Sequence, residues 1–199
     1  MPAFEMIFHS NNPTRDKFLS RIFGIFNEEI VRCWCNDPRA PYENLGRPTI
    51  TREATRRGRT LDFTFRSRNG GHVYIGEMKC WLEFENYRYL ALESSSQLNH
   101  LTDETFRLFL DAAKEPDQYQ VTVKGKLRPI DGAILVWGKC TERGRVSVIE
   151  RFGLHTVLSL EEITTDLVAQ GNERFLELLD QREKWCKELF DGLRRTSQL

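Results

Sequence analysis

The sequence lacks long apolar stretches, a cysteine framework and an excess of one charge. Its longest apolar runs, such as residues 132–138, fall far short of the about 20 residues that cross a membrane. The first residues show no basic segment followed by a long apolar stretch, the pattern of a secretory signal. The five cysteines do not have the spacing of zinc or iron–sulfur ligands, which favours reduced thiols. We therefore expect a cytoplasmic protein that makes no membrane contact.

The charge balance hides a local asymmetry. Acids and bases number 29 each, which argues against a protein that coats nucleic acid by bulk charge. Residues 47–68 nevertheless hold seven arginines against two acids, and residues 161–191 hold nine acids against four bases. This segregation fits either a positive patch on a neutral protein or two solvated surfaces.

The length and the aromatic content favour one domain with a real core. The chain has 199 residues, among them 13 Phe, 4 Trp and 5 Tyr, so it is not disordered. We expect a single domain over residues 1–199, with a core at about 14–160 and C-terminal helices over 161–199. The sequence has no nucleophile-elbow, phosphate-loop or dinucleotide-binding motif, so serine-hydrolase, NTPase and dinucleotide functions have no support.

Apolar periodicity gives the order of the elements. It predicts helices over 14–35, 94–113, 144–152 and 172–195, and a helix that opens with a capping box at 159–162. It predicts strands over 49–55, 59–67, 72–81, 119–123, 132–138 and 155–160, with a hairpin turn at 69–71. A hairpin followed by strands that helices connect predicts an α/β fold whose mixed sheet has helices on both sides.

Charged residues interrupt the predicted hairpin. Asp62 lies near the start of one strand, and Glu77 and Lys79 lie two residues apart on the returning strand, so their side chains share a face. Ile75 lies on that face too, so it is not simply the solvent side. Charges among apolar strand residues are costly unless they are paired or bind a metal. A cross-strand salt bridge on a surface hairpin is the alternative.

The helix predicted over 14–35 carries a second charge in an apolar setting. Six of its residues form one apolar arc: Leu19, Ile22, Phe23, Phe26, Ile30 and Cys33. Glu29 falls inside this arc, whereas Glu28 falls opposite. We expect Glu28 in solvent and Glu29 turned toward the sheet, where Lys79 or a metal ion would compensate its charge.

Asp62, followed across a hairpin by Glu77-Met78-Lys79 and preceded by a helix with an inward Glu, resembles the PD-(D/E)XK nuclease superfamily. The resemblance covers about residues 18–137 and departs from the family pattern at Leu61, where the motif has proline. It implies a three-layer α/β/α fold with a central mixed β-sheet, the restriction-endonuclease-like fold. It also implies metal-dependent hydrolysis of phosphodiester bonds.

The resemblance assigns roles to the site residues. Asp62, Glu77 and the backbone carbonyl of Met78 would bind Mg²⁺, for which Mn²⁺ could substitute, because hard oxygen ligands suit these ions. Lys79 would orient or help to deprotonate the attacking water and offset charge in the transition state. Glu29 would be a further ligand or would hold a second metal.

Nearby polar residues are candidates for contacting the substrate. Arg56, Arg57 and Arg59 precede the Asp62 strand, where they would either contact backbone phosphates or form a solvated turn. Gln97 opens the next predicted helix, at a place where some branches of the superfamily have a substrate-contacting Gln. The alternative for Gln97 is a polar residue that only starts the helix.

The leading hypothesis is therefore a Mg²⁺-dependent, endonuclease-like enzyme that hydrolyses nucleic acid, with DNA rather than RNA as the expected substrate. The alternative is a catalytically silent nucleic-acid-binding or assembly module with the same fold. A third interpretation is an interaction protein that uses the helix at 172–195 as a dimer face, and a homodimer is also compatible with the nuclease hypothesis.

Overall fold

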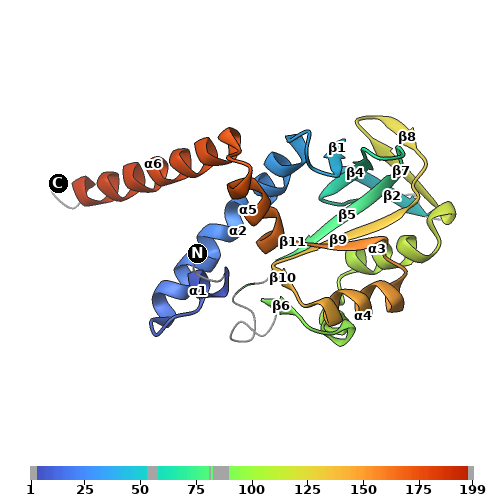
Figure 1. Ribbon diagram of the computed structural model, residues 1–199, viewed down its shortest axis with the longest axis horizontal. Coiled ribbons are helices and arrows are strands. Elements are labelled where there is room, and N and C mark those ends of the chain that lie inside the picture. The colour runs from blue at the N-terminus through green and yellow to red at the C-terminus, as the bar shows by residue number, and fades with distance from the viewer. Residues whose placement is uncertain (1–3, 53–57, 81, 83–89, 197–199) are drawn as a thin grey trace.

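The computed structural model describes residues 4–52, 58–80, 82 and 90–196 (Figure 1). Its helices are α1 (Phe4–Phe8), α2 (Pro13–Asn36), α3 (Glu104–Lys114), α4 (Glu142–Phe152), α5 (Leu160–Ala169) and α6 (Glu173–Thr196), with 3₁₀ helices η1 (Ser95–His100) and η2 (Pro116–Gln118). Its strands are β1 (Tyr42–Asn44), β2 (Pro48–Arg52), β3 (Arg59–Thr60), β4 (Phe63–Ser67), β5 (Val73–Lys79), β6 (Ala91–Leu92), β7 (Tyr119–Val123), β8 (Lys126–Arg128), β9 (Gly132–Trp137), β10 (Lys139–Cys140) and β11 (Thr156–Ser159).

The central sheet is mixed, as the sequence predicts. Its strand order is β1-β4-β5-β9-β11. β4 and β5 form the antiparallel hairpin, and β5, β9 and β11 run parallel. Every residue of β9 is buried, which confirms that its continuous apolar run belongs to a strand covered on both faces. A second sheet has the order β3-β2-β7-β8, and β6 pairs with β10.

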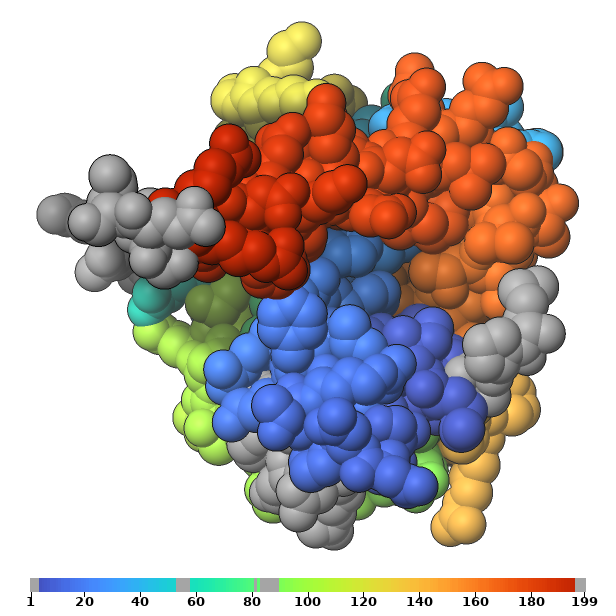
Figure 2. All heavy atoms as spheres, turned by 90° about the vertical axis from the view of Figure 1, so that its left-hand side faces the viewer, coloured from blue at the N-terminus to red at the C-terminus, as the bar shows by residue number. Residues whose placement is uncertain are grey.

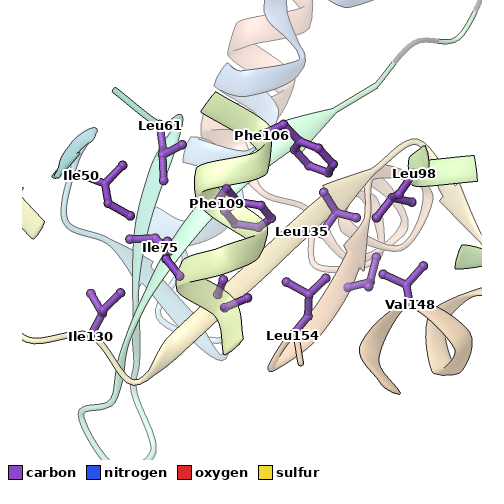
Figure 3. Close-up of a cluster of buried hydrophobic side chains, with 14 of the residues drawn as sticks. Ile50, Leu61, Ile75, Leu98, Phe106, Phe109, Ile130, Leu135, Val148 and Leu154 are labelled. Atoms are coloured by element: carbon purple, nitrogen blue, oxygen red, sulfur yellow. The ribbon is translucent and has the colours of Figure 1, made fainter. Parts of the chain in front are cut away.

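Apolar residues fill both faces of the central sheet. On one face, Ile75 and Leu135 pack with Phe106 and Phe109 of α3 and Val148 of α4 (Figure 3). On the other face, the neighbouring strand residues pack with side chains from α1, α2 and α5. The alternation of side chains along each strand divides them between the two clusters.

Two predicted elements are divided in the structure. The helix predicted over 94–113 is two helices, η1 and α3, because the Asp103 carboxylate accepts a hydrogen bond from the Phe106 N–H (2.8 Å) and starts a new helix. The strand predicted over 59–67 is divided between β3 and β4. β3 pairs with β2 in the second sheet and β4 pairs with β5 in the central sheet, so the chain changes sheets at Leu61 and Asp62.

The buried face of α2 is rotated from the expected apolar arc. Its buried residues are Asp16, Ser20, Phe23, Asn27, Ile30, Val31, Trp34 and Cys35. Among the polar ones, Asp16 accepts hydrogen bonds from the backbone and the hydroxyl of Ser10 (2.5 and 2.8 Å). A helix face with such partners can be buried although it is not the most apolar one.

All five cysteines are free, as expected. Within the described part of the chain, no helix combines the length and the apolar character that crossing a membrane requires.

Candidate active site

The site residues lie where β5 extends past its hairpin partner. Phe63, the first residue of β4, pairs with Gly76, so among the described residues the next three residues of β5 have strand pairing only with β9. At this open edge, the Met78 N–H donates a hydrogen bond to Asp62 Oδ2 (2.9 Å). The N–H and C=O of one residue in an extended strand point to the same side. The Met78 carbonyl therefore also points toward the Asp62 side.

Glu77 and Lys79 lie together on the α3 face of β5. The Lys79 Nζ is 3.0 Å from Glu77 Oε1 and 3.5 Å from Asp103 Oδ2 at the start of α3. The side chains of Glu77 and Lys79 are only 7% and 14% exposed. The ammonium is also 5.3 Å from the centre of the Phe106 ring. These contacts hold Lys79 in one position beside Glu77.

Burial and nearby negative charge disfavour the ionised form of Glu77. Burial is the largest cause that raises the pKa of Glu77 to about 7, and the charge of Asp62 adds to it. The Lys79 ammonium opposes the rise. Among the described residues, the buried Oε2 atom of Glu77 has no hydrogen-bond partner. One oxygen of this carboxylate is thus left for a cation or a donor to satisfy.

The oxygen atoms at this edge fit a hard divalent cation. Mg²⁺ is usually bound through one or two protein carboxylates and keeps several waters. Asp62, Glu77 and the Met78 carbonyl offer that kind of donor set. No group of three or more His, Cys, Asp or Glu in the described residues is arranged to hold a metal.

The expectation for Glu29 is wrong. Its carboxylate forms an ion pair with Arg182 of α6, and its side chain is 37% exposed. The residues of α2 that pack on the sheet belong to the cluster on the face opposite Ile75, whereas Glu77 and Lys79 share the Ile75 face. The structure does not bring Glu29 to the other three residues. Glu28 is partly exposed and pairs with Arg32 one turn away (2.6 Å).

Asp103 and Arg47 join the site although the sequence did not single them out. Arg47 Nη2 lies 3.3 Å from Asp62 Oδ1, so this exposed arginine flanks the carboxylate. Asp103 was hidden inside a predicted continuous helix. The sequence did contain an indication of a helix start here. Asp103 is directly followed by Glu104, and an Asp before an acidic first turn is common at helix N-termini.

The arginines of residues 47–68 do not form one free patch. Arg59 pairs with Glu104, next to Asp103, and so lies near the site. Arg66 pairs with Glu43, and Arg68 donates to the backbone carbonyls of Ala40 and Cys35. The predicted substrate contacts Arg56 and Arg57 lie outside the described residues.

Gln97 has a local structural role in this structure. Its Oε1 accepts hydrogen bonds from the N–H groups of Glu93 and Ser94 (2.7 and 3.1 Å). Its Nε2 donates to the Ala91 carbonyl (2.9 Å). The amide therefore closes the turn before η1, which is the helix-start alternative.

No family model, curated protein or solved structure matches this chain.

Proposed function

We propose that the protein is a metal-dependent phosphodiester hydrolase that cleaves nucleic acid, with DNA as the expected substrate. The observation that carries this proposal is the pairing of Glu77 with Lys79 (3.0 Å) beside Asp62, at an open strand edge. A buried glutamate beside a second, partly exposed carboxylate and an ammonium is more than the stability of a strand requires. A perturbed carboxylate such as Glu77 is typical of a functional site.

The arrangement of the elements supports the proposal. The hairpin lies between α2 and α3 in sequence, helices contribute to the cores on both faces of the sheet, and β9 continues the sheet in parallel. This is compatible with the three-layer α/β/α, restriction-endonuclease-like fold that the motif implies. The carboxyl ends of parallel strands are also where open α/β sheets bind ligands, and Glu77 and Lys79 lie at that end of β5.

Each residue has a task that its contacts fit. Asp62, held by the Met78 N–H, and Glu77 would bind Mg²⁺ or Mn²⁺ together with the Met78 carbonyl. Such an ion would supply a more acidic water and would neutralise charge on the phosphate. The Lys79 ammonium, held by Glu77 and Asp103, donates hydrogen bonds to the attacking water or to a phosphate oxygen. Arg47 and Arg59 are near enough to bind flanking phosphates.

Cleavage assays with Mg²⁺ or Mn²⁺ on single- and double-stranded DNA and RNA test this proposal. Glu77→Gln and Asp62→Asn should each lower cleavage by about 10²-fold or more. They should also remove the rise in melting temperature that the metal ion causes in the wild type. Lys79→Met should lower cleavage but keep the metal-induced rise, because the ammonium acts on water and phosphate.

Glu29→Gln is the matched control. It also replaces a glutamate by its amide, but the structure pairs this glutamate with Arg182 away from β5. Cleavage and metal binding should stay at the wild-type level. If the wild type binds nucleic acid without cutting it and shows no metal-induced rise in melting temperature, the silent binding module replaces the enzyme.

A further inference from the structure

An apolar groove lies between α1, α2, α5 and the start of α6. Its volume is about 630 Å³, and it is lined almost entirely by apolar side chains, among them Phe8, Ile22, Phe26, Val168 and Leu179. These four helices meet on the face that Figure 2 presents. Val168 and Leu179 remain 46% and 37% exposed. Part of the expected apolar arc of α2 therefore faces this groove, because Ile22 and Phe26 line it.

The C-terminal half of α6 carries an apolar surface that stays largely exposed, although the Phe190 ring lies 6.3 Å from that of Phe18 in α2. Near the start of the helix, Phe175 is buried at 4% exposure. Further along, Trp185, Leu189, Phe190 and Leu193 are 40–59% exposed. Figure 1 shows α6 projecting past the body of the molecule toward its C-terminal end. Large exposed apolar side chains grouped on one helix usually mark an interaction surface.

The groove and this half of α6 carry opposite charges. Helices α1, α2 and α5 and residues 173–183 of α6, which surround the groove, hold eleven acids and six bases. α5 alone has three acids and no base. Residues 184–195 hold four bases and two acids. The two surfaces therefore complement each other in both polarity and charge.

We propose that the protein is a homodimer in which the C-terminal half of each α6 docks in the groove of the other copy. A continuous helix of 24 residues is about 36 Å long, so the end of α6 cannot fold back into its own groove without breaking. A second copy supplies the same helix and the same groove. The two contacts are then identical and related by a two-fold axis, the commonest form of oligomer. This inference does not depend on the proposed enzymatic function.

Sedimentation equilibrium of the full chain over a wide range of concentration tests the proposal. The wild type should behave as a dimer of the 23.4 kDa chain. Leu189→Glu changes the docking helix, and Val168→Glu changes the groove. Each should raise the dimer dissociation constant more than about tenfold. Both residues are substantially exposed, at 59% and 46%, so thermal melts should show that the fold is kept.

Leu127→Glu is the matched control, because Leu127 is 66% exposed on β8, away from the groove helices. It should leave the dissociation constant unchanged. Lys187→Glu, on the basic half of α6, should weaken the dimer, and raising the salt concentration should weaken the wild type.

Mixing the two disrupted chains tests the reciprocal geometry. The Leu189→Glu chain keeps its groove, and the Val168→Glu chain keeps its docking helix. The mixture should form a heterodimer with one intact contact, more stable than either homodimer. A monomeric wild type overturns the proposal. This holds also if the groove of that monomer is found to bind a fatty acid in place of α6. A dimer that Leu189→Glu does not weaken, or a mixture that forms no heterodimer, overturns it as well.

Discussion

The two faces of β5 differ in what they require of the sequence. On one face, Tyr74 and Met78 pack with the aromatic rings of β4, and the Gly76 position leaves room for those rings. On the other face, Ile75 is buried in the core, but Glu77 and Lys79 follow it toward the end of the strand. The stability of the first face depends on how well the side-chain volumes fit. The stability of the second depends on how the charges of Glu77 and Lys79 are compensated. A single strand can therefore stabilise the fold and carry a reactive site, because successive side chains point to opposite sides.

The largest effect should come from filling the space on the packed face. In Gly76→Ala, the new Cβ would lie 2.4 Å from Phe65 Cε2 and 2.9 Å from Phe63 Cβ, so buried groups must move. We expect a loss of about 3 kcal/mol in the free energy of unfolding, measured by denaturant titration. Gly24→Ala in α2 is the control, since nothing lies within 4 Å of its Cβ. It should stabilise the helix by about 0.5–1 kcal/mol. Equal effects of the two substitutions would contradict the packing explanation.

Glu77 on the charged face should make the free energy of unfolding depend on pH. The pKa of Glu77 is about 7 in the folded protein, against a usual 4.5. Below pH 4.5 Glu77 is protonated in both the folded and the unfolded state, so it does not lower the free energy of unfolding. As the pH rises toward 7 and above, the unfolded state binds fewer protons than the folded one, and the wild type loses stability. In metal-free buffer, Glu77→Gln should remove a loss of roughly 2–3 kcal/mol between pH 5 and 8, measured by urea unfolding. A pH-independent difference between the two proteins would contradict this cause.

Asp103 tests how α3 supports the charged face. Asp103→Ala removes the hydrogen bond to the Phe106 N–H and should cost about 1 kcal/mol of unfolding free energy. Asp103→Asn keeps a capping side chain but removes the charge 3.5 Å from Lys79 Nζ. Urea unfolding should therefore show nearly wild-type stability for Asn, while a pH titration followed by NMR should show a lowered pKa of Glu77, because a like charge is gone. A larger loss of stability for Asn than for Ala would show that capping is not the role of Asp103.

The smallest effect is expected at the other glutamate considered for the site. Glu29 pairs with Arg182 between α2 and α6, and its own side chain is 37% exposed, so solvent screens the pair and its contribution should be small. Glu29→Gln should change the free energy of unfolding by less than about 0.5 kcal/mol, as measured by thermal melts at several salt concentrations. A loss comparable to that caused by Gly76→Ala would show that this ion pair holds α6 in place.

Most of the secondary structure followed from local pattern. The predicted strand at 119–123 coincides with β7, and the predicted helices at 14–35 and 172–195 agree with α2 and α6 within one residue at each end. Ser159 caps α5 as predicted, since its Oγ accepts from the Glu162 N–H (3.1 Å), but the Glu162 carboxylate pairs with Arg145, so only this half of the capping box is seen. The predicted helix at 94–113 failed because apolar periodicity continued through a place where Asp103 starts a new helix.

The candidate site was predictable only where strand geometry decided it. The two-residue spacing of Glu77 and Lys79 put them on one face in any regular strand. The place of Asp62 beside Met78 needed the hairpin register as well, and the turn at 69–71 indicated that hairpin. Glu29 was misplaced because helical phase shows which residues share a face but not which face meets the sheet.

The sequence by itself determined the alternation of side chains along β5 and the hairpin before it. Together these place the charged residues at one end of the strand. Both could be predicted because strand periodicity and turn chemistry act over a few residues. Only the tertiary structure decided that Asp103 and Arg47 reach the site, that Glu29 leaves it, and that the apolar arc of α2 lines a groove. These outcomes depend on how helices pack against the sheet and against one another. Such packing joins residues distant in sequence through buried volume and compensated charge, which no local pattern records.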